Sequence, residues 1–251
     1  MFDYYFQHSE FYLCILFRVL GFVLSAPLLK SKNLPSRVKG FLIIVLTFIV
    51  SMSMEPESYD SQLNLFDYIS NLFAGILVGM MLMVVFEMMG IGGHFIAMGS
   101  GLGFSTLVDP STGGQASTLS SFYKAAGSLI FVFMGGILSM LMILKDSFEL
   151  VPLPMSMFPE ITIDYVLVFF RYSLESALLL SAPMLFTALL VNLAFGVISK
   201  ASPSLNIFSV GFPAGILVTI FFISLTIDSL PLLVRRMLDD LPSLIAGVYG
   251  V

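Results

Sequence analysis

A few ionisable side chains stand inside long apolar runs of this sequence, where a charge is costly and is by default either functional or paired. They are Glu87, Lys124, Arg171 and Glu175. Arg171 and Glu175 are four residues apart, a spacing that brings two side chains together on one face of a helix. We therefore favour a local ion pair between them over a proton relay. A pairing of Glu87 with Lys124, which flank a glycine-rich stretch, is left open by the sequence.

Hydrolytic and metal chemistry find little support. His94, Ser100 and Ser105 lie close together. However, the passage around Ser105 lacks the second glycine of a nucleophile elbow, and no carboxylate is evidently placed to orient the histidine. His94 has no Cys, Asp or Glu at ligand spacing, which favours a structural histidine over a pH switch and predicts no metal site. A phosphate-binding loop is also missing. We predict a protein that is not an enzyme and that uses no cofactor.

The elements that position these side chains are organised around residues 90–121, a stretch rich in glycine that contains Asp109 followed by Pro110. Glycine in a helix has an entropic cost, and a proline disfavours helical dihedrals for the residue before it. Lipid offers no hydrogen-bond partners to non-helical backbone, which must therefore be buried by protein or line a water-filled cavity. We predict that this stretch is a re-entrant loop facing a passage.

Composition indicates a polytopic membrane protein. The chain of 251 residues is 58% hydrophobic and only 11% charged, which excludes a soluble globular domain and a disordered chain. It has no basic face of the kind that binds nucleic acid. We expect an all-α membrane fold with about six hydrophobic helical segments. The single domain, 1–251, would comprise N-terminal helices (1–89), the glycine-rich loop (90–121), middle helices (122–200) and a C-terminal helical segment (201–251).

Several small or special residues inside these segments predict how the helices pack. Gly75 and Gly79 are four apart in a long apolar segment, which lets a neighbouring helix approach closely. Residues 122–144 are expected to form one helix. Pro183 should kink the helix that contains it. The lone cysteine, Cys14, lies in an apolar run and is expected to be packing filler.

Methionines cluster close to the glycine-rich stretch. Three of them, Met88, Met89 and Met98, lie next to it or within it. Flexible thioether side chains repack without a fixed rotamer, so they can form a compliant seal around a sliding polypeptide. Ordinary core packing is the favoured interpretation, and the seal is kept as the alternative.

Three passages far apart in the chain carry a family resemblance. The first runs from Arg18-Val-Leu-Gly21 through Ala26-Pro27-Leu28 to Leu34-Pro-Ser-Arg-Val-Lys39; the second is Gly101-Leu-Gly-Phe-Ser-Thr-Leu-Val-Asp-Pro110 with Gly114-Gln115; the third is Asn192-Leu-Ala-Phe-Gly196 with Ser204-Leu-Asn-Ile-Phe208 and Gly211-Phe-Pro213. In order and spacing they resemble the FliR family of flagellar export-gate proteins, called SctT in injectisomes. Members often have a Gly-His pair in the fourth helix, where this chain has Gly135-Gly136, so no role of that histidine carries over.

The resemblance implies that the helical segments are arranged as hairpins. It also implies a subunit that coils with FliP-type and FliQ-type subunits into a helical export gate, docked by an FlhB-type switch subunit. It also implies a place in the bacterial inner membrane, within the flagellar basal body, in contact with membrane lipid. Unfolded export substrates would pass through this gate. Nucleic acid is not among the expected partners.

In such relatives the loop around Val-Asp-Pro plugs the pore from within, and here the corresponding residues would be Gly101, Gly103, Phe104, Leu107, Val108, Asp109, Pro110, Gly113 and Gly114. The glycines would supply bends and the apolar side chains a seal, since a dry constriction blocks ions by dewetting. A buried connector without a gating role is the plainer alternative for the same residues.

A second function uses the same broken helices differently. Glu87 and Asp109 could form the midplane site of a secondary transporter or ion channel. That hypothesis predicts inverted repeats, which we do not find in the sequence.

Overall fold

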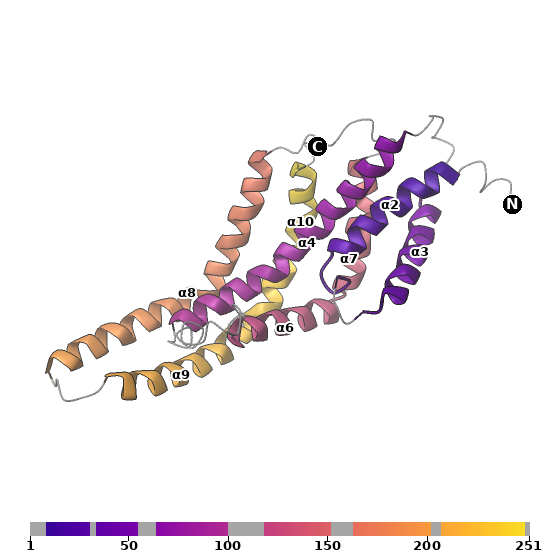
Figure 1. Cartoon of the computed structure of the whole chain (residues 1–251). Coiled ribbons are helices and arrows are strands. Elements are labelled where there is room, and N and C mark those ends of the chain that lie inside the picture. The colour runs from indigo at the N-terminus through magenta and orange to yellow at the C-terminus, as the bar shows by residue number, and fades with distance from the viewer. Residues whose placement is uncertain are drawn as a thin grey trace. The chain divides into compact units, whose positions relative to one another are not determined.

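The computed structural model describes residues 9–30, 34–54, 64–99, 118–151, 163–201 and 207–248. Within these ranges the regular structure is helical, and no residue belongs to a β-strand (Figure 1). The predicted all-α fold is therefore confirmed.

The described helices are separated by breaks of very different length. In chain order they are α2 (Ser9–Ser25), α3 (Ser36–Met52), α4 (Leu65–Gly99), α6 (Thr118–Phe133), α7 (Gly136–Leu150), α8 (Ile163–Ala201), α9 (Ile207–Thr226), the short 3-10 helix η3 (Ile227–Ser229) and α10 (Leu230–Val248). Among the residues that the structure describes, three stretches are long and apolar enough to cross a membrane, namely Leu65–Gly99, Val166–Ile198 and Gly215–Val248. The bent pair of α6 and α7 is a fourth candidate. These spans confirm the membrane class.

The chain folds into two compact units. The first unit comprises residues 1–84, 135–169 and 238–251, and the second comprises residues 85–134 and 170–237. Helices α4, α8 and α10 each contribute residues to both units.

Helices α2 and α4 of the first unit touch backbone to backbone. A Cβ atom on Gly75 would lie 1.9 Å from the carbonyl oxygen of Arg18, and one on Gly21 would lie 2.2 Å from that of Leu72. Gly79 meets α2 one turn further along, 2.1 Å from a serine hydroxyl. Any side chain at these positions would push the helices apart. The close approach predicted at Gly75 and Gly79 is confirmed.

Arg18 lies fully buried beside this contact and links three helices of the first unit. Its Nε and Nη2 donate to Oδ1 of Asn71 at 3.0 and 2.6 Å, and its Nη1 donates to the carbonyl oxygens of Ser147 and Val151 at 2.7 and 2.9 Å. The ring centroid of Phe148 is 4.2 Å from the guanidinium carbon. The end of a helix leaves carbonyls unpaired and partly negative, so a buried cation is well placed there. Arg18 thus joins α2 to α4 and caps α7.

The structure differs from two of the predicted helix boundaries. The helix expected over residues 122–144 is broken at Gly135, whose φ of +78° is a left-handed conformation that L side chains rarely adopt. The non-helical stretch expected to begin at residue 90 begins later, because α4 stays helical through Gly99. Helix α8 contains Pro183 and is visibly bent, as a proline inside a helix predicts (Figure 1). Cys14 is fully buried, as its filler role predicts.

We predict that replacing Arg18 by Met destabilises the protein. The amide oxygen of Asn71 and the carbonyl of Val151 would lose the donors that Arg18 supplies in a dry interior, and each unsatisfied buried group costs about 1–3 kcal/mol, whereas the Ser147 carbonyl keeps the N–H of Val151. A lower melting temperature of the detergent-purified protein would report this loss. The matched control is Lys145→Met on α7, because Lys145 is exposed and pairs only at the surface, with Glu149 at 3.4 Å. Equal melting temperatures for the two variants would contradict the role given to Arg18.

Candidate functional site

An ion pair joins α4 to α6 in the second unit. Oε2 of Glu87 lies 2.5 Å from Nζ of Lys124, and the two side chains are 44% and 36% exposed. The pairing that the sequence left open is therefore formed. Both residues belong to apolar candidate membrane segments, yet neither is sealed inside the unit.

Lys124 reaches Glu87 by lying across a glycine. A Cβ atom on Gly90 would lie 2.1 Å from Cε of Lys124 and 2.9 Å from its Cγ. Gly90 follows Glu87 by one helical turn, so the absence of a side chain there leaves room for the lysine stem. The geometry of the ion pair thus depends on Gly90 as well as on the two charges.

Two further glycines bring α4 and α6 into direct contact along this seam. A Cβ atom on Gly93 would lie 2.7 Å from the carbonyl oxygen of Leu119, which is backbone and cannot easily move away. On α6, Gly127 receives the thioether of Met89, whose sulfur would lie 1.8 Å from an added Cβ. The α4–α6 seam is therefore packed too tightly for a side chain at Gly93, whereas a side chain at Gly127 would have to displace the thioether of Met89.

Other glycines of α4 allow close packing against α8. A Cβ atom on Gly92 would lie 2.8 Å from Cδ2 of Leu180, and one on Gly99 would lie 3.2 Å from Cβ of Ala188. The glycines between residues 90 and 99 thus face two different neighbours. They allow close packing on both, which explains why this part of the chain remains helical in spite of its composition.

Helices α9 and α10 join the seam through Tyr123 of α6. Its hydroxyl lies 2.7 Å from that of Thr226, whose hydroxyl also donates to the carbonyl of Phe222 at 2.8 Å. Tyr123 belongs to a buried apolar cluster whose other members are Ile96, Leu180, Met184 and Leu230. The cluster draws on α4, α8 and α10 and holds the second unit together around α6.

The predicted methionine seal divides into two kinds of residue. Met88 and Met89 are each 1% exposed and pack inside the protein. Met98 is 59% exposed. Core packing, the favoured interpretation, fits the buried Met88 and Met89. Of the three, only Met98 is exposed enough to contact a passing polypeptide, as a seal requires.

The remaining predicted charges behave differently. Arg171 and Glu175 are both exposed on α8, and in the described part of the chain no ion pair joins them. Their spacing permits a pair but does not enforce one, because an exposed pair gains little free energy over two solvated side chains. His94 is exposed on α4. No group of three or more potential metal ligands occurs among the residues that the structure describes.

The predicted plug residues lie outside the described residues. They are Gly101, Gly103, Phe104, Leu107, Val108, Asp109, Pro110, Gly113 and Gly114. Sequence reasoning gave no role to Arg18, Gly90 or Gly127. The sequence did indicate a special role for Arg18, because it is a lone arginine within an apolar run. The roles of Gly90 and Gly127 could be recognised only from the side chains of the neighbouring helix that pack on them.

We predict that Gly93→Leu disrupts the α4–α6 seam. The new side chain would meet the backbone of α6, and overpacking of this kind typically costs about 1–3 kcal/mol. Less protein in the membrane and a lower melting temperature should follow. Gly196→Leu on α8 is the matched control, because nothing lies within 4 Å of a Cβ atom at Gly196. If both variants accumulate and melt like the parent protein, the seam tolerates a side chain and its proposed tightness is wrong.

Comparison with known proteins agrees with the resemblance seen in the sequence. The model of the family described as bacterial export proteins, family 1, matches residues 10–241. The flagellar biosynthetic protein FliR of Aquifex aeolicus is 29% identical over 235 residues, covering 91% of this chain and 90% of the relative. FliR of Escherichia coli K12 is 26% identical over 242 residues, covering 94% and 91%.

A relative with a different name also matches. The surface presentation of antigens protein SpaR of Shigella flexneri is 24% identical over 216 residues, covering 83% of this chain and 82% of the relative. The matches run through both units and include every helix that forms the α4–α6 seam. Since the family model spans nearly the whole chain, the protein belongs to bacterial export proteins, family 1, the family of FliR and SctT.

Proposed function

We propose that this chain is a structural and gating subunit of a flagellar type III protein-export gate. Family membership makes it a component of a type III export apparatus, and its apolar helices place it in a membrane. The finer proposal is that it helps form the pore for unfolded export substrates and closes that pore with an internal plug. In this role it is a conduit and not an enzyme.

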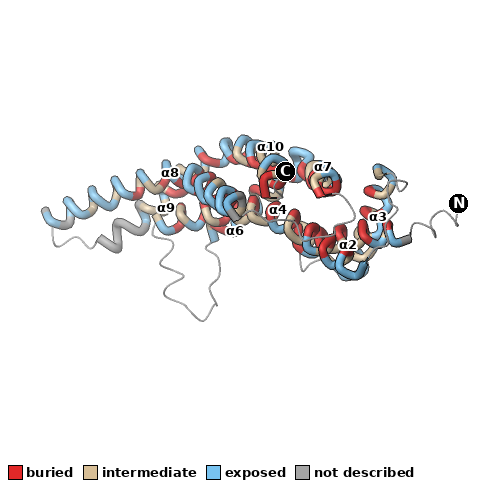
Figure 2. Tube along the Cα trace, turned by 90° about the horizontal axis from the view of Figure 1, so that it is seen from above, coloured by how far each residue is buried: buried red, intermediate tan, exposed pale blue. Residues whose placement is uncertain are grey.

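The observation that carries the assembly proposal is the uncovered surface of the later helices. Only 22% of the apolar window in Val166–Ile198 and 17% of that in Gly215–Val248 are buried within the chain, against 56% for α4. Figure 2 shows the exposed length of α8. Lipid can cover apolar side chains, but the exposed Arg171 and Glu175 on α8 need polar partners. Sister subunits can supply both kinds of contact.

We assign these contacts to FliP-type and FliQ-type subunits, with an FlhB-type subunit docking on the assembled gate. The support is the family resemblance together with the uncovered helices. The corresponding location is the bacterial inner membrane at the flagellar basal body. Membrane lipid would cover whatever apolar surface the sister subunits leave free.

The plug is proposed for the segment that contains Val108, Asp109 and Pro110. This segment leaves α4 after Gly99 and returns to α6 at Thr118, so both of its ends are held by helices that the Gly93 seam packs together. Its apolar residues Phe104, Leu107 and Val108 are suited to a dry constriction. The exposed Met98 would contribute a compliant contact close to it.

Deleting residues 111–114 should make the assembled gate leak small ions, because the shortened segment could no longer fill the constriction. The leak is measured with a potential-sensitive dye in cells that express the complete gate. The control is a full-length variant in which Thr112, Gly113 and Gly114 are replaced by serine. Co-purification of the partner subunits establishes that each gate has assembled. An unchanged leak through an assembled gate would contradict the plug proposal but not the proposed role as a gate subunit. If the chain does not co-purify with any export component, its proposed role as a gate subunit is wrong.

A further inference from the structure

The second unit exposes two helix faces of opposite character. Beyond Glu175, the exposed side chains of α8 are almost all apolar, with Phe186, Leu189, Leu193 and Val197 between 56% and 71% exposed. Within this unit, α4 instead exposes His94 and Met98 and leaves Glu87 partly exposed. The two faces therefore suit different surroundings.

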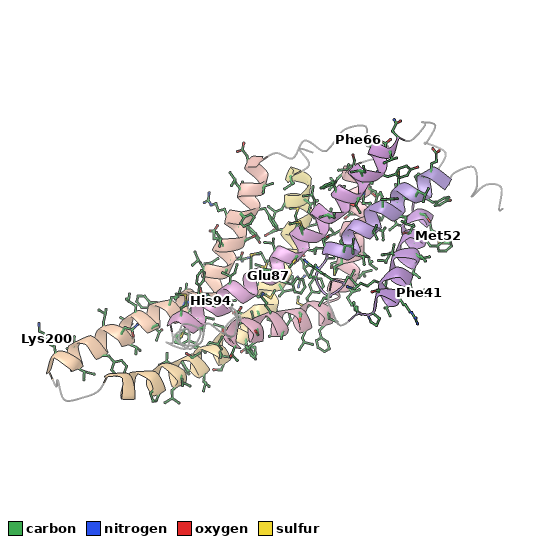
Figure 3. The ribbon with its side chains drawn as sticks, in the orientation of Figure 1. Phe41, Met52, Phe66, Glu87, His94 and Lys200 are labelled. Atoms are coloured by element: carbon green, nitrogen blue, oxygen red, sulfur yellow. The ribbon has the colours of Figure 1, made fainter. Side chains whose placement is uncertain are left out.

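Glu87, His94 and the apolar Met98 share one side of α4. Glu87, His94 and Met98 follow one another at intervals of seven and four residues, which returns each to the same face at 3.6 residues per turn. Figure 3 labels Glu87 and His94 along this helix. Lys124 extends the face onto α6, and Ser121, one turn before it, is exposed as well. We call Glu87, His94, Ser121 and Lys124 the polar face, which the exposed Met98 adjoins.

The far side of α4 is already occupied. Met88, Met89, Ile96 and Ala97 are at most 1% exposed. The polar face is thus what remains of α4 after it has packed on its neighbours in the second unit. Ionisable side chains in membrane segments face a bundle interior or a water-filled cavity, because acyl chains do not solvate them. Lipid is therefore a poor occupant for this face.

A sister subunit is a poor occupant as well. Glu87 and Lys124 already neutralise each other at 2.5 Å, so neither presents a net charge for a partner subunit to match. Covering the pair would remove its water without adding a compensating contact. A neutral, hydrated pair is suited to a passage, since it retains neither acidic nor basic segments of a chain moving past it.

We propose that the polar face lines the water-filled part of the export passage, and that its occupant during transport is a hydrated, unfolded polypeptide. This inference rests on the proposed function and adds to it the particular helix surface that meets the cargo. The apolar face of α8 points away from the passage, toward lipid or sister subunits.

Thiol accessibility tests the proposal in the complete membrane-embedded gate. The single native cysteine, Cys14, is fully buried and is replaced by serine to give a background without thiols. Single cysteines then replace His94 on the polar face and Met98 next to it. Leu189 and Leu193 on α8 serve as exposed apolar controls, and Ala97 serves as a buried control. The probe is a charged, membrane-impermeant methanethiosulfonate, which reacts with the thiolate and therefore requires water at the site.

Cysteines at positions 94 and 98 should react at least about tenfold faster than those at 189 and 193, because thiols in an apolar surrounding stay protonated. Position 97 should remain unreactive. Labelling after denaturation with detergent confirms that each thiol is present. An export substrate fused to a domain too stable to unfold should stall in the passage and slow the reaction at 94 and 98.

Two results would overturn the inference. One is equal reactivity at the α4 and α8 positions in an assembled gate. The other is rapid labelling of 94 and 98 in the free chain that disappears on assembly without any substrate, which would make the polar face a subunit interface. Either result leaves the chain a gate subunit if it still co-purifies with the export assembly, so loss of this inference is distinguishable from loss of the proposed function.

Discussion

Direct contact between helix backbones at glycine is the constraint on which both units depend. Gly75 brings α4 onto α2, while Gly93 and Gly92 bring the same helix onto α6 and α8. Between helices in lipid there is little hydrophobic driving force, so close van der Waals packing has to supply much of the association energy. Helix α4 can pack on three neighbours because its glycines face in different directions.

The important charges lie beside these glycine contacts. Arg18 donates to two carbonyls at the end of α7 within the α2–α4 contact, where it is fully buried. Lys124 crosses Gly90 to reach Glu87, and that pair stays partly exposed. The first arrangement satisfies a buried cation with fixed acceptors and stabilises the fold. The second leaves a neutral pair open to its surroundings, as a hydrated surface requires.

The pairing also bears on the competing functions. A secondary transporter or ion channel would use Glu87 as a free carboxylate at a midplane site. In this structure that carboxylate forms an ion pair with Lys124. The poorly covered helices α8, α9 and α10 favour a chain that completes its surface with other subunits. Both features agree with a component of an export assembly more readily than with a self-contained carrier.

Composition alone determined the membrane class, the Gly75 and Gly79 spacing determined one close helix contact, and three short passages determined the family. Only the tertiary structure decided that α4 stays helical to Gly99 and that Gly135 breaks a helix where the sequence predicts none. It also decided which charges meet, joining Glu87 to Lys124 but not Arg171 to Glu175. The physical reason is that a glycine or a charge has no fixed effect within its own segment: close packing by a distant helix offsets the entropic cost of a glycine, and a partner within reach decides whether a charge is paired.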